Sequence, residues 1–336
     1  MSFKCSNLLV TGGAGFIGSN FLKFISLKYP DLNIINLDKL TYASDLNYLS
    51  EISSNKNYNF IKGDICDSIL LKDIFYDYKI DGVINFAAET HVDNSILNPE
   101  IFVKSNINGV YNLLNSCYNF WMKSPFKTKS NFKNARFHQI STDEIYGSIE
   151  NGSFDEASNY MPNSPYSASK ASADMMVRSF NKTYGLNTTI SVSSNNFGLN
   201  QNIEKFIPKV INSILNNESI IIYGDGKNVR DWLYVDDHCK AIDLIFNNAS
   251  SGEIYNVGAK NEITNIDLVE IIYQIISQFT KRQKIIKFVD DRHGHDMRYS
   301  LNIDKIKSQL NWTNPDGFHE NLTQYIKEII DSHNNV

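Results

Sequence analysis

The sequence predicts an α/β fold in which a doubly wound parallel sheet is joined to a smaller C-terminal α/β domain. Over the first 194 residues, short apolar runs alternate with helical patterns, as expected for strand–helix units with right-handed crossovers. A glycine-rich turn at residues 11–18 joins the first apolar run to the first helical pattern. The chain has 336 residues, which exceeds a typical domain and leaves room for a second, smaller one.

Each element of the sheet has its own signal. Residues 7–10 form an apolar run closed by the glycine turn, which is typical of a buried strand. A helix is expected from about Gly15 to Lys28, because Ile17, Phe21 and Ile25 recur on one face. Later elements are predicted as strands at 33–38, 59–64, 82–87, 136–141 and 188–193 and as a helix from about Tyr166 to Tyr184.

The regular alternation loosens after residue 194 into short segments separated by Gly, Asn and Pro. We therefore predict a first domain at residues 1–194 and a second, substrate-binding domain at 195–336, with a helix near 234–248 returning to the first. Residues 123–133 are polar and basic, and we expect a solvated connection there.

Composition excludes several classes of protein. The net charge is −5 and the pI about 5.8, so no basic surplus exists to bind nucleic acid. The four cysteines are scattered, without a metal-binding cluster or a disulfide pattern, which favours reduced thiols in the cytoplasm and no metal. No run of 18 apolar residues suggests a membrane span.

The glycine turn indicates a dinucleotide site. Gly12-x-x-Gly15-x-x-Gly18 overlaps Gly13-x-Gly15-x-x-Gly18, and such glycines let a pyrophosphate approach the N-terminus of the following helix. Asp38 lies 20 residues beyond Gly18, where a carboxylate binds an adenosine ribose and repels a 2′-phosphate. A Rossmann-like domain binding NAD is therefore predicted, although the adjacent Lys39 leaves NADP open.

Two further pairs of residues carry reaction chemistry. Tyr166 and Lys170 are one helical turn apart, so the ammonium is expected to lower the phenol pKa and let phenolate take a sugar hydroxyl proton while hydride passes to nicotinamide. Asp143 and Glu144 follow a predicted strand; in a closed pocket one can stay protonated as an acid while the other acts as a base. Taken alone, this acid pair could equally mark a helix start.

Short motifs spread over nearly the whole chain match those of a known enzyme family. The chain resembles the extended short-chain dehydrogenase/reductase family, most closely its nucleoside-diphosphate-glucose 4,6-dehydratases of the dTDP-glucose type. The matching segments are residues 11–18, 38–43, 63–65, 87–93, 141–144, 164–171, 194–196, 224–232 and 291–299.

The resemblance implies a role for each matching residue. Asp143 would protonate the C6 hydroxyl, Glu144 would act as base at C5, and Thr142 would hold the sugar. The implied NAD-binding residues are Gly12, Gly15, Phe16, Ile17, Gly18, Asp38, Lys39, Leu40, Thr41, Asp64, Ile65, Ala87, Ala88, Glu89, Ser105, Tyr166, Lys170 and Asn196. The implied substrate-binding residues are His91, Thr142, Asn195, Lys205, Phe206, Ile221, Tyr223, Arg230, Asn265, His295, Arg298 and Tyr299.

These inferences predict NAD-dependent dehydration of dTDP-glucose to the 4-keto-6-deoxy sugar. A UDP-glucose 4,6-dehydratase remains open, because one methyl group in a pocket discriminates by only about 1–3 kcal/mol and Phe197, Leu199 and Ile203 depart from the family pattern on the nucleotide side. A 4-epimerase or a non-catalytic NAD-binding scaffold is a more remote alternative. The resemblance also implies a homodimer formed by the helices near 110–121 and 169–184.

Overall fold

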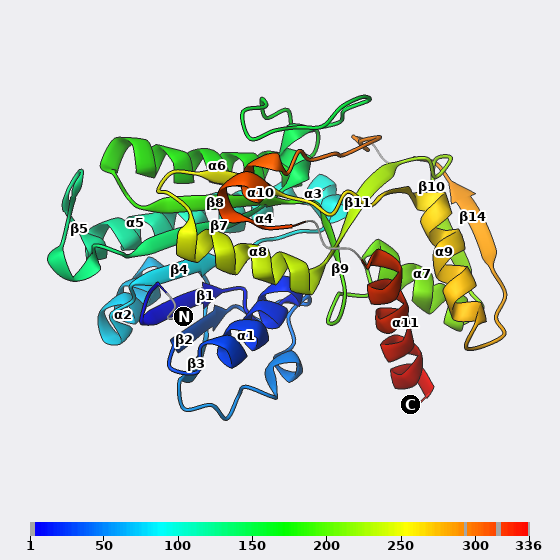
Figure 1. Cartoon of the computed structure of the whole chain (residues 1–336), viewed down its shortest axis with the longest axis horizontal. Helices are drawn as coiled ribbons and strands as arrows, with labels where there is room; N and C mark the ends of the chain where they lie inside the picture. Colours follow the sequence, from blue (N-terminus) through cyan, green and yellow to red (C-terminus); the bar gives the residue numbers. More distant parts are fainter. Residues whose placement is uncertain (1–3, 292–293, 314–316, 335–336) are drawn as a thin grey trace.

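The computed structural model describes residues 4–291, 294–313 and 317–334, so residues 292–293 of the last motif lie outside it. A seven-stranded parallel sheet forms its centre, in the order β12-β8-β7-β4-β1-β2-β3 (Figure 1). This confirms the predicted fold class. The strands are β1 (Asn7–Thr11), β2 (Asn33–Asp38), β3 (Tyr58–Lys62), β4 (Gly82–Asn85), β7 (Arg136–Thr142), β8 (Thr188–Ser193) and β12 (Ile254–Val257).

Helices cover both faces of this sheet, which explains why its strands are apolar on both sides. Leu8 and Val10 of β1 pack with α1 (Phe16–Lys28) and α8 (Val235–Asn248). Leu9, between them, faces the opposite layer. That layer contains α2 (Ser68–Tyr78), α5 (Gly109–Trp121) and α6 (Pro165–Tyr184).

The boundaries of α6 follow from its sequence. Ser164 caps its N-terminus and forms a reciprocal capping box with Ser167, which satisfies two backbone donors. Pro165 occupies the first turn, where no N–H partner is needed. Gly185 ends the helix at a φ of 71°, a left-handed conformation that glycine adopts without strain.

The C-terminal part builds its own smaller core. Two sheets support it: one has the order β13-β11-β9 and the other pairs β10 with β14. Their strands are β9 (Asn195–Phe197), β10 (Ser219–Tyr223), β11 (Val229–Tyr234), β13 (Glu262–Thr264) and β14 (Ile285–Val289). The accompanying helices are α7 (Phe206–Leu215), α9 (Asn265–Ser277) and α11 (Phe318–Asn334). Helix α10 (Asp304–Leu310) instead packs against β12 and α8.

The chain returns to the first layer from this C-terminal part. Helix α8 packs on α1, and β12 pairs in parallel with β8 at the edge of the large sheet. The sequence pattern indicated the helix but not the strand, because four residues are too few for a periodic signal. The division at residue 195 stays a prediction.

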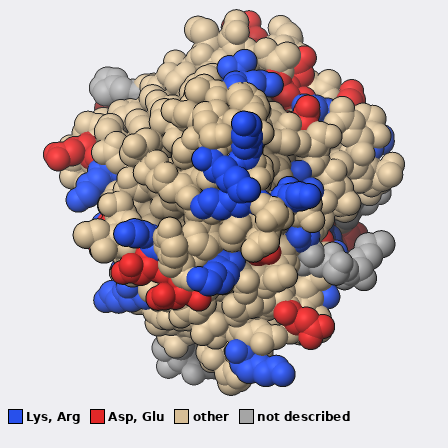
Figure 2. Space-filling view, turned by 90° about the vertical axis from the view of Figure 1, so that its left-hand side faces the viewer, with Lys and Arg blue, Asp and Glu red and all other residues tan. Residues whose placement is uncertain are grey.

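Shorter elements connect the large ones. The basic segment after α5 contains the hairpin β5 (Met122–Ser124) and β6 (Lys127–Thr128), followed by η3 (Ser130–Phe132). The face on the left of Figure 1 gathers Lys and Arg side chains, with acidic side chains beside them (Figure 2). Within the described residues, no helix combines the length and apolar character needed to cross a membrane. The remaining short helices are η1 (Leu46–Leu49), α3 (Val92–Leu97), α4 (Pro99–Phe102), η2 (Val103–Asn108) and η4 (Asp143–Tyr146).

Candidate active site

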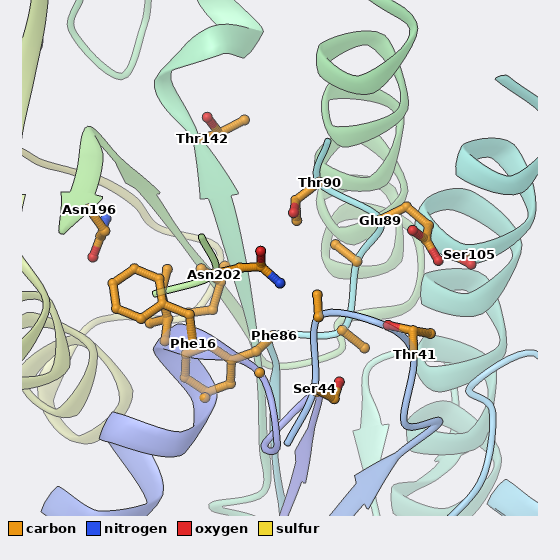
Figure 3. Close-up of a pocket in the computed structure, with 18 of the residues that line it drawn as sticks. Phe16, Thr41, Ser44, Phe86, Glu89, Thr90, Ser105, Thr142, Asn196 and Asn202 are labelled. Atoms are coloured by element: carbon orange, nitrogen blue, oxygen red, sulfur yellow. The ribbon is translucent and has the colours of Figure 1, made fainter. Parts of the chain in front are cut away.

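A pocket opens at the carboxyl ends of the central strands. The strand order reverses there, because β1 lies between β2 and β4, and ligands of open α/β sheets bind at such a point. In Figure 3, Thr142 and Asn196 lie at one end of the pocket, and Thr41 and Ser44 at the other. The predicted residues that line it are Gly12, Gly15, Phe16, Ile17, Gly18, Asp38, Lys39, Thr41, Asp64, Ile65, Ala87, Ala88, Glu89, Ser105, Thr142, Asp143, Glu144, Tyr166, Lys170, Asn195, Asn196 and Lys205.

The glycine turn is shaped for close backbone approach. A Cβ on Gly12 would lie 2.6 Å from the Ala87 nitrogen, and one on Gly18 would lie 2.3 Å from the Gly12 oxygen. Gly15 precedes the first turn of α1 without a side-chain cap, so backbone N–H groups at this helix end remain available to an anion. These observations fit a dinucleotide pyrophosphate.

Asp38 is fixed at the end of β2 by three donors. It accepts hydrogen bonds from the backbone nitrogens of Ala14 at 2.9 Å and Leu40 at 2.8 Å, and from the Ser44 hydroxyl at 3.0 Å. Leu40 does not line the pocket, because its side chain packs on the core; its backbone nitrogen orients Asp38. The buried carboxylate is therefore preorganised for a ribose.

Lys39, the residue that could favour NADP, forms an ion pair with another residue of the pocket lining. Its Nζ lies 2.8 Å from Oδ2 of Asp64, which follows β3. This ion pair competes with any phosphate for the ammonium of Lys39, which favours NAD.

Lys170 and Tyr166 are both buried on α6. Lys170 Nζ donates a hydrogen bond to the Ile140 carbonyl at 2.6 Å, and burial lowers its pKa to about 8. Burial raises the pKa of Tyr166 above its ordinary value, and the charge of Glu144 adds to this rise. Desolvation and the charge of Glu144 dominate the pKa of Tyr166, so the net lowering that we expected from Lys170 is wrong for this structure.

The acid pair begins η4 directly after β7. Asp143 is buried, and within the described residues its Oδ2 has no hydrogen-bond partner. Burial raises its pKa well above the usual range, and the neighbouring Glu144 raises it further, while Arg230 acts in the opposite direction. Asp143 is therefore suited to remain protonated. Glu144 is half-buried beside it.

Arg230 and Tyr299 lie near the acid pair, although they do not line the pocket. The guanidinium carbon lies 4.3 Å from the centre of the Tyr299 ring, and Arg230 donates to the Asp296 carbonyl at 2.9 Å. The Tyr299 hydroxyl donates to the Asp296 carboxylate at 2.7 Å. The charge of Glu144 also raises the pKa of Tyr299 after burial, which links this cluster to the acid pair.

The other predicted substrate residues lie outside the pocket lining. Arg298 binds Glu262 at 2.6 and 3.1 Å, and His295 lies 2.6 Å from Asp291. His91 caps α3. The remaining ones are Phe206, stacked on Trp232, Ile221 and Tyr223 on β10, and Asn265 at the start of α9.

Part of the pocket lining has residues that were not predicted from the sequence. Gln201, Asn202 and Glu204 belong to an irregular segment that gave no periodic signal. Ser44, which binds Asp38, could have been found from its place just after the motif at 38–43. The other missed lining residues are Leu37, Ala43, Gly63, Phe86, Thr90, Ile140, Ser141, Ser193 and Ser194. Among the described residues, no three His, Cys, Asp or Glu side chains gather as a metal site.

The chain is similar to known proteins over nearly its whole length. The family model described as GDP-mannose 4,6 dehydratase matches residues 9–325. The chain belongs to this 4,6-dehydratase family. The dTDP-glucose 4,6-dehydratase of Haemophilus influenzae is 43% identical over 96% of this chain and 97% of its own. The Escherichia coli protein of the same name is 41% identical over 95% and 92%.

Solved structures agree with the family assignment. The dTDP-glucose 4,6-dehydratase of Streptomyces venezuelae, solved with NAD bound, has a TM-score of 0.89 and 37% identity and covers 98% of both chains. The UDP-glucose 4-epimerase of Thermotoga maritima has a TM-score of 0.85 and 27% identity and covers 97% of this chain and 99% of its own. These matches confirm the resemblance that the motifs indicated.

Proposed function

We propose that this protein catalyses the NAD-dependent dehydration of dTDP-glucose to dTDP-4-keto-6-deoxyglucose. The observation that carries the proposal is the buried Asp143, whose pKa burial raises, beside Glu144 in the pocket that also holds Tyr166 and Lys170. Relatives at 43% and 41% identity bear the name of this activity. A 4-epimerase is disfavoured, because epimerisation has no use for an acid pair that eliminates water.

The first step belongs to Tyr166 and Lys170. We infer that the Tyr166 oxygen takes the proton of the C4 hydroxyl, while the Lys170 ammonium stabilises negative charge on that oxygen. Bound NAD would supply the acceptor for the C4 hydride and the donor that returns it to C6, and C5 would then take back a proton. The resulting 4-keto group makes the C5 hydrogen acidic.

The elimination belongs to the acid pair. Glu144 takes the C5 proton, a double bond forms between C5 and C6, and the C6–O bond breaks. Asp143 gives its proton to the departing hydroxyl, which leaves as water. This assignment uses the residue with the raised pKa as the acid and the half-buried carboxylate as the base.

The nucleotide diphosphate would be held from the C-terminal part of the chain. Arg230 and Arg298 carry the planar donors that suit phosphate oxygens. We assign the remaining contacts to His91, Asn195, Lys205, Phe206, Ile221, Tyr223, Asn265, His295 and Tyr299. The preference for thymine over uracil is part of this proposal.

A direct assay separates the candidate substrates. Protein is incubated separately with dTDP-glucose and UDP-glucose, and the alkali-induced absorbance of a 4-keto sugar is recorded. We expect a strong signal with dTDP-glucose. A stronger signal with UDP-glucose would shift the proposal to that substrate, and no signal with either would contradict dehydratase activity.

Retention of NAD tests the cofactor assignment separately. Because the net reaction consumes no NAD, the cofactor need not leave between turnovers. We expect protein purified by gel filtration to release NAD on denaturation, detected by enzymatic cycling. Absence of released dinucleotide would contradict tight binding.

We also propose a homodimer. Exposed apolar side chains gather on α3, α4, η2, α5 and α6, which contact one another. Leu97 is 84% exposed, Met175 49%, Val103 48% and Tyr111 44%, and such a patch marks an interface. Met175→Glu should reduce the mass measured by light scattering, whereas Leu27→Glu on α1 should not. An unchanged mass for Met175→Glu would contradict this surface.

A cytoplasmic location belongs to the same proposal. Cys5, Cys66, Cys117 and Cys239 are all free thiols, as expected in a reducing compartment.

A further inference from the structure

Helix α6 carries a third ionisable residue in register with the reacting pair. Tyr166, Lys170 and Asp174 follow one another at intervals of four residues, so all three lie on one face of the helix. Asp174 is only 1% exposed and does not line the pocket. The reaction described above gives it no role.

The contacts of Asp174 are unusual for a buried carboxylate. Its Oδ2 accepts a hydrogen bond from the Ser141 hydroxyl at 2.5 Å, while its Oδ1 has no hydrogen-bond partner in the described part of the chain. Burying a carboxylate with one partner is costly, and such a group calls for an explanation. Ser141 itself lines the pocket at the end of β7, so this contact connects Asp174 to the site.

Lys170 needs a counter-charge. Its ammonium is buried and donates to the neutral Ile140 carbonyl, and among the described residues no carboxylate lies within ion-pair distance of it. Asp174, one turn further along α6, is the carboxylate whose charge acts on Lys170. An uncompensated ammonium in such a site would lose its proton.

We propose that Asp174 is a positioning residue, held by Ser141, whose negative charge behind Lys170 keeps Lys170 cationic beside Tyr166. This inference rests on the proposed function, because it concerns the oxidation of the C4 hydroxyl. Asp174 acts through Lys170 and touches no reacting atom.

The charges of Asp174 and Lys170 shift each other's pKa in directions that favour their charged forms. Burial lowers the pKa of Lys170 to about 8, and Asp174 opposes this shift. Burial raises the pKa of Asp174 to about 7, and Lys170 opposes that shift. Asp174 also raises the pKa of Tyr166, after burial and the acid pair. The other groups that face Asp174 are Ser141 of β7, Tyr146 of η4 and Tyr160 of the loop before α6.

Removal of the charge should therefore lower the pKa of Lys170 and of Tyr166 together. In Asp174→Asn, the whole profile of kcat against pH is expected to move to lower pH by about one unit. At a fixed pH on the basic limb activity should fall roughly tenfold, whereas at a fixed pH on the acidic limb it should rise. A residue that only packs would lower the profile without moving it.

The experiment compares four proteins, each with its NAD content measured. Asp174→Asn should show the shift, Asp174→Glu should restore the wild-type profile, and Tyr160→Phe, a half-buried neighbour without the charge, should leave the profile in place. If Asp174→Asn does not fold, Ser141→Ala serves instead, because loss of its hydrogen bond raises the pKa of Asp174 and moves the basic limb in the same direction by a smaller amount. Unmoved limbs in the folded variant overturn the inference. A wild-type protein without dehydratase activity overturns the proposed function first, and this inference with it.

Discussion

Replacement of Asp143 by asparagine isolates the elimination step. The two side chains have nearly the same shape, so Tyr166, Lys170 and Glu144 keep their places. The amide carries no proton that it can give to the C6 hydroxyl. Because Asp143 is buried and its Oδ2 has no partner within the described residues, water cannot readily substitute for it.

The size of the effect follows from the role. A positioned general acid contributes about 10²–10⁴-fold, which corresponds to a loss of about 3–5 kcal/mol of transition-state stabilisation. Formation of the 4-keto-6-deoxy product should fall by this factor. Removal of the C5 proton by Glu144 should continue, because it precedes departure of the hydroxyl.

Deuterium exchange distinguishes removal of the C5 proton from departure of the C6 hydroxyl. The variant is incubated with dTDP-glucose in heavy water, and recovered substrate is examined by mass spectrometry. We expect deuterium at C5 although little product forms. In Glu144→Gln, both deuterium incorporation and product should be lost. Equal loss of both signals in Asp143→Asn would refute the division of roles.

The same variant tests the raised pKa of Asp143 through stability. The uncharged form stabilises the fold fully below the unfolded pKa of about 4, and this contribution is lost as pH rises towards the higher folded pKa. Asparagine does not titrate, so the Tm of the variant relative to wild type should rise as the pH increases above about 4. Each unit of pKa shift corresponds to about 1.4 kcal/mol, or roughly 2 °C. A constant difference would show that Asp143 ionises normally.

Tyr166→Phe should lower kcat by about 10²-fold or more, and it should incorporate no deuterium at C5, because C4 is not oxidised; incorporation at the wild-type rate would contradict its role. Asp64→Asn frees Lys39, so the affinity for NADP relative to NAD, measured by calorimetry on protein stripped of nucleotide, should rise about fivefold. The double variant with Lys39→Ala is the control and should lose this gain, whereas a gain that persists would exclude the ion pair as the cause.

The sequence predicted those parts of the fold that depend on local chemistry. The glycine turn, helix α6 and the apolar strands each have a signal within their own residues, and each lies where it was expected. Strand β12 and the hairpin of β5 and β6 lack such a signal, because they are two to four residues long and form through pairing with distant partners. The pKa of Tyr166 was wrongly predicted for a related reason: it depends on burial and on Glu144, which helix spacing does not reveal.

The residues expected to bind NAD and to react are positioned differently from those expected to bind the substrate nucleotide. Most of the residues expected to hold NAD and to react follow the ends of β1, β2, β3, β4 and β7 or lie on α6, so the sheet places them around one pocket. Those expected to bind the nucleotide are held by side-chain contacts: Arg230 on Tyr299, Arg298 on Glu262 and His295 on Asp291. A phosphate that binds either arginine must compete with the contact that holds it now. Substitutions in this half should therefore change KM more than kcat, whereas substitutions at the strand ends should change kcat.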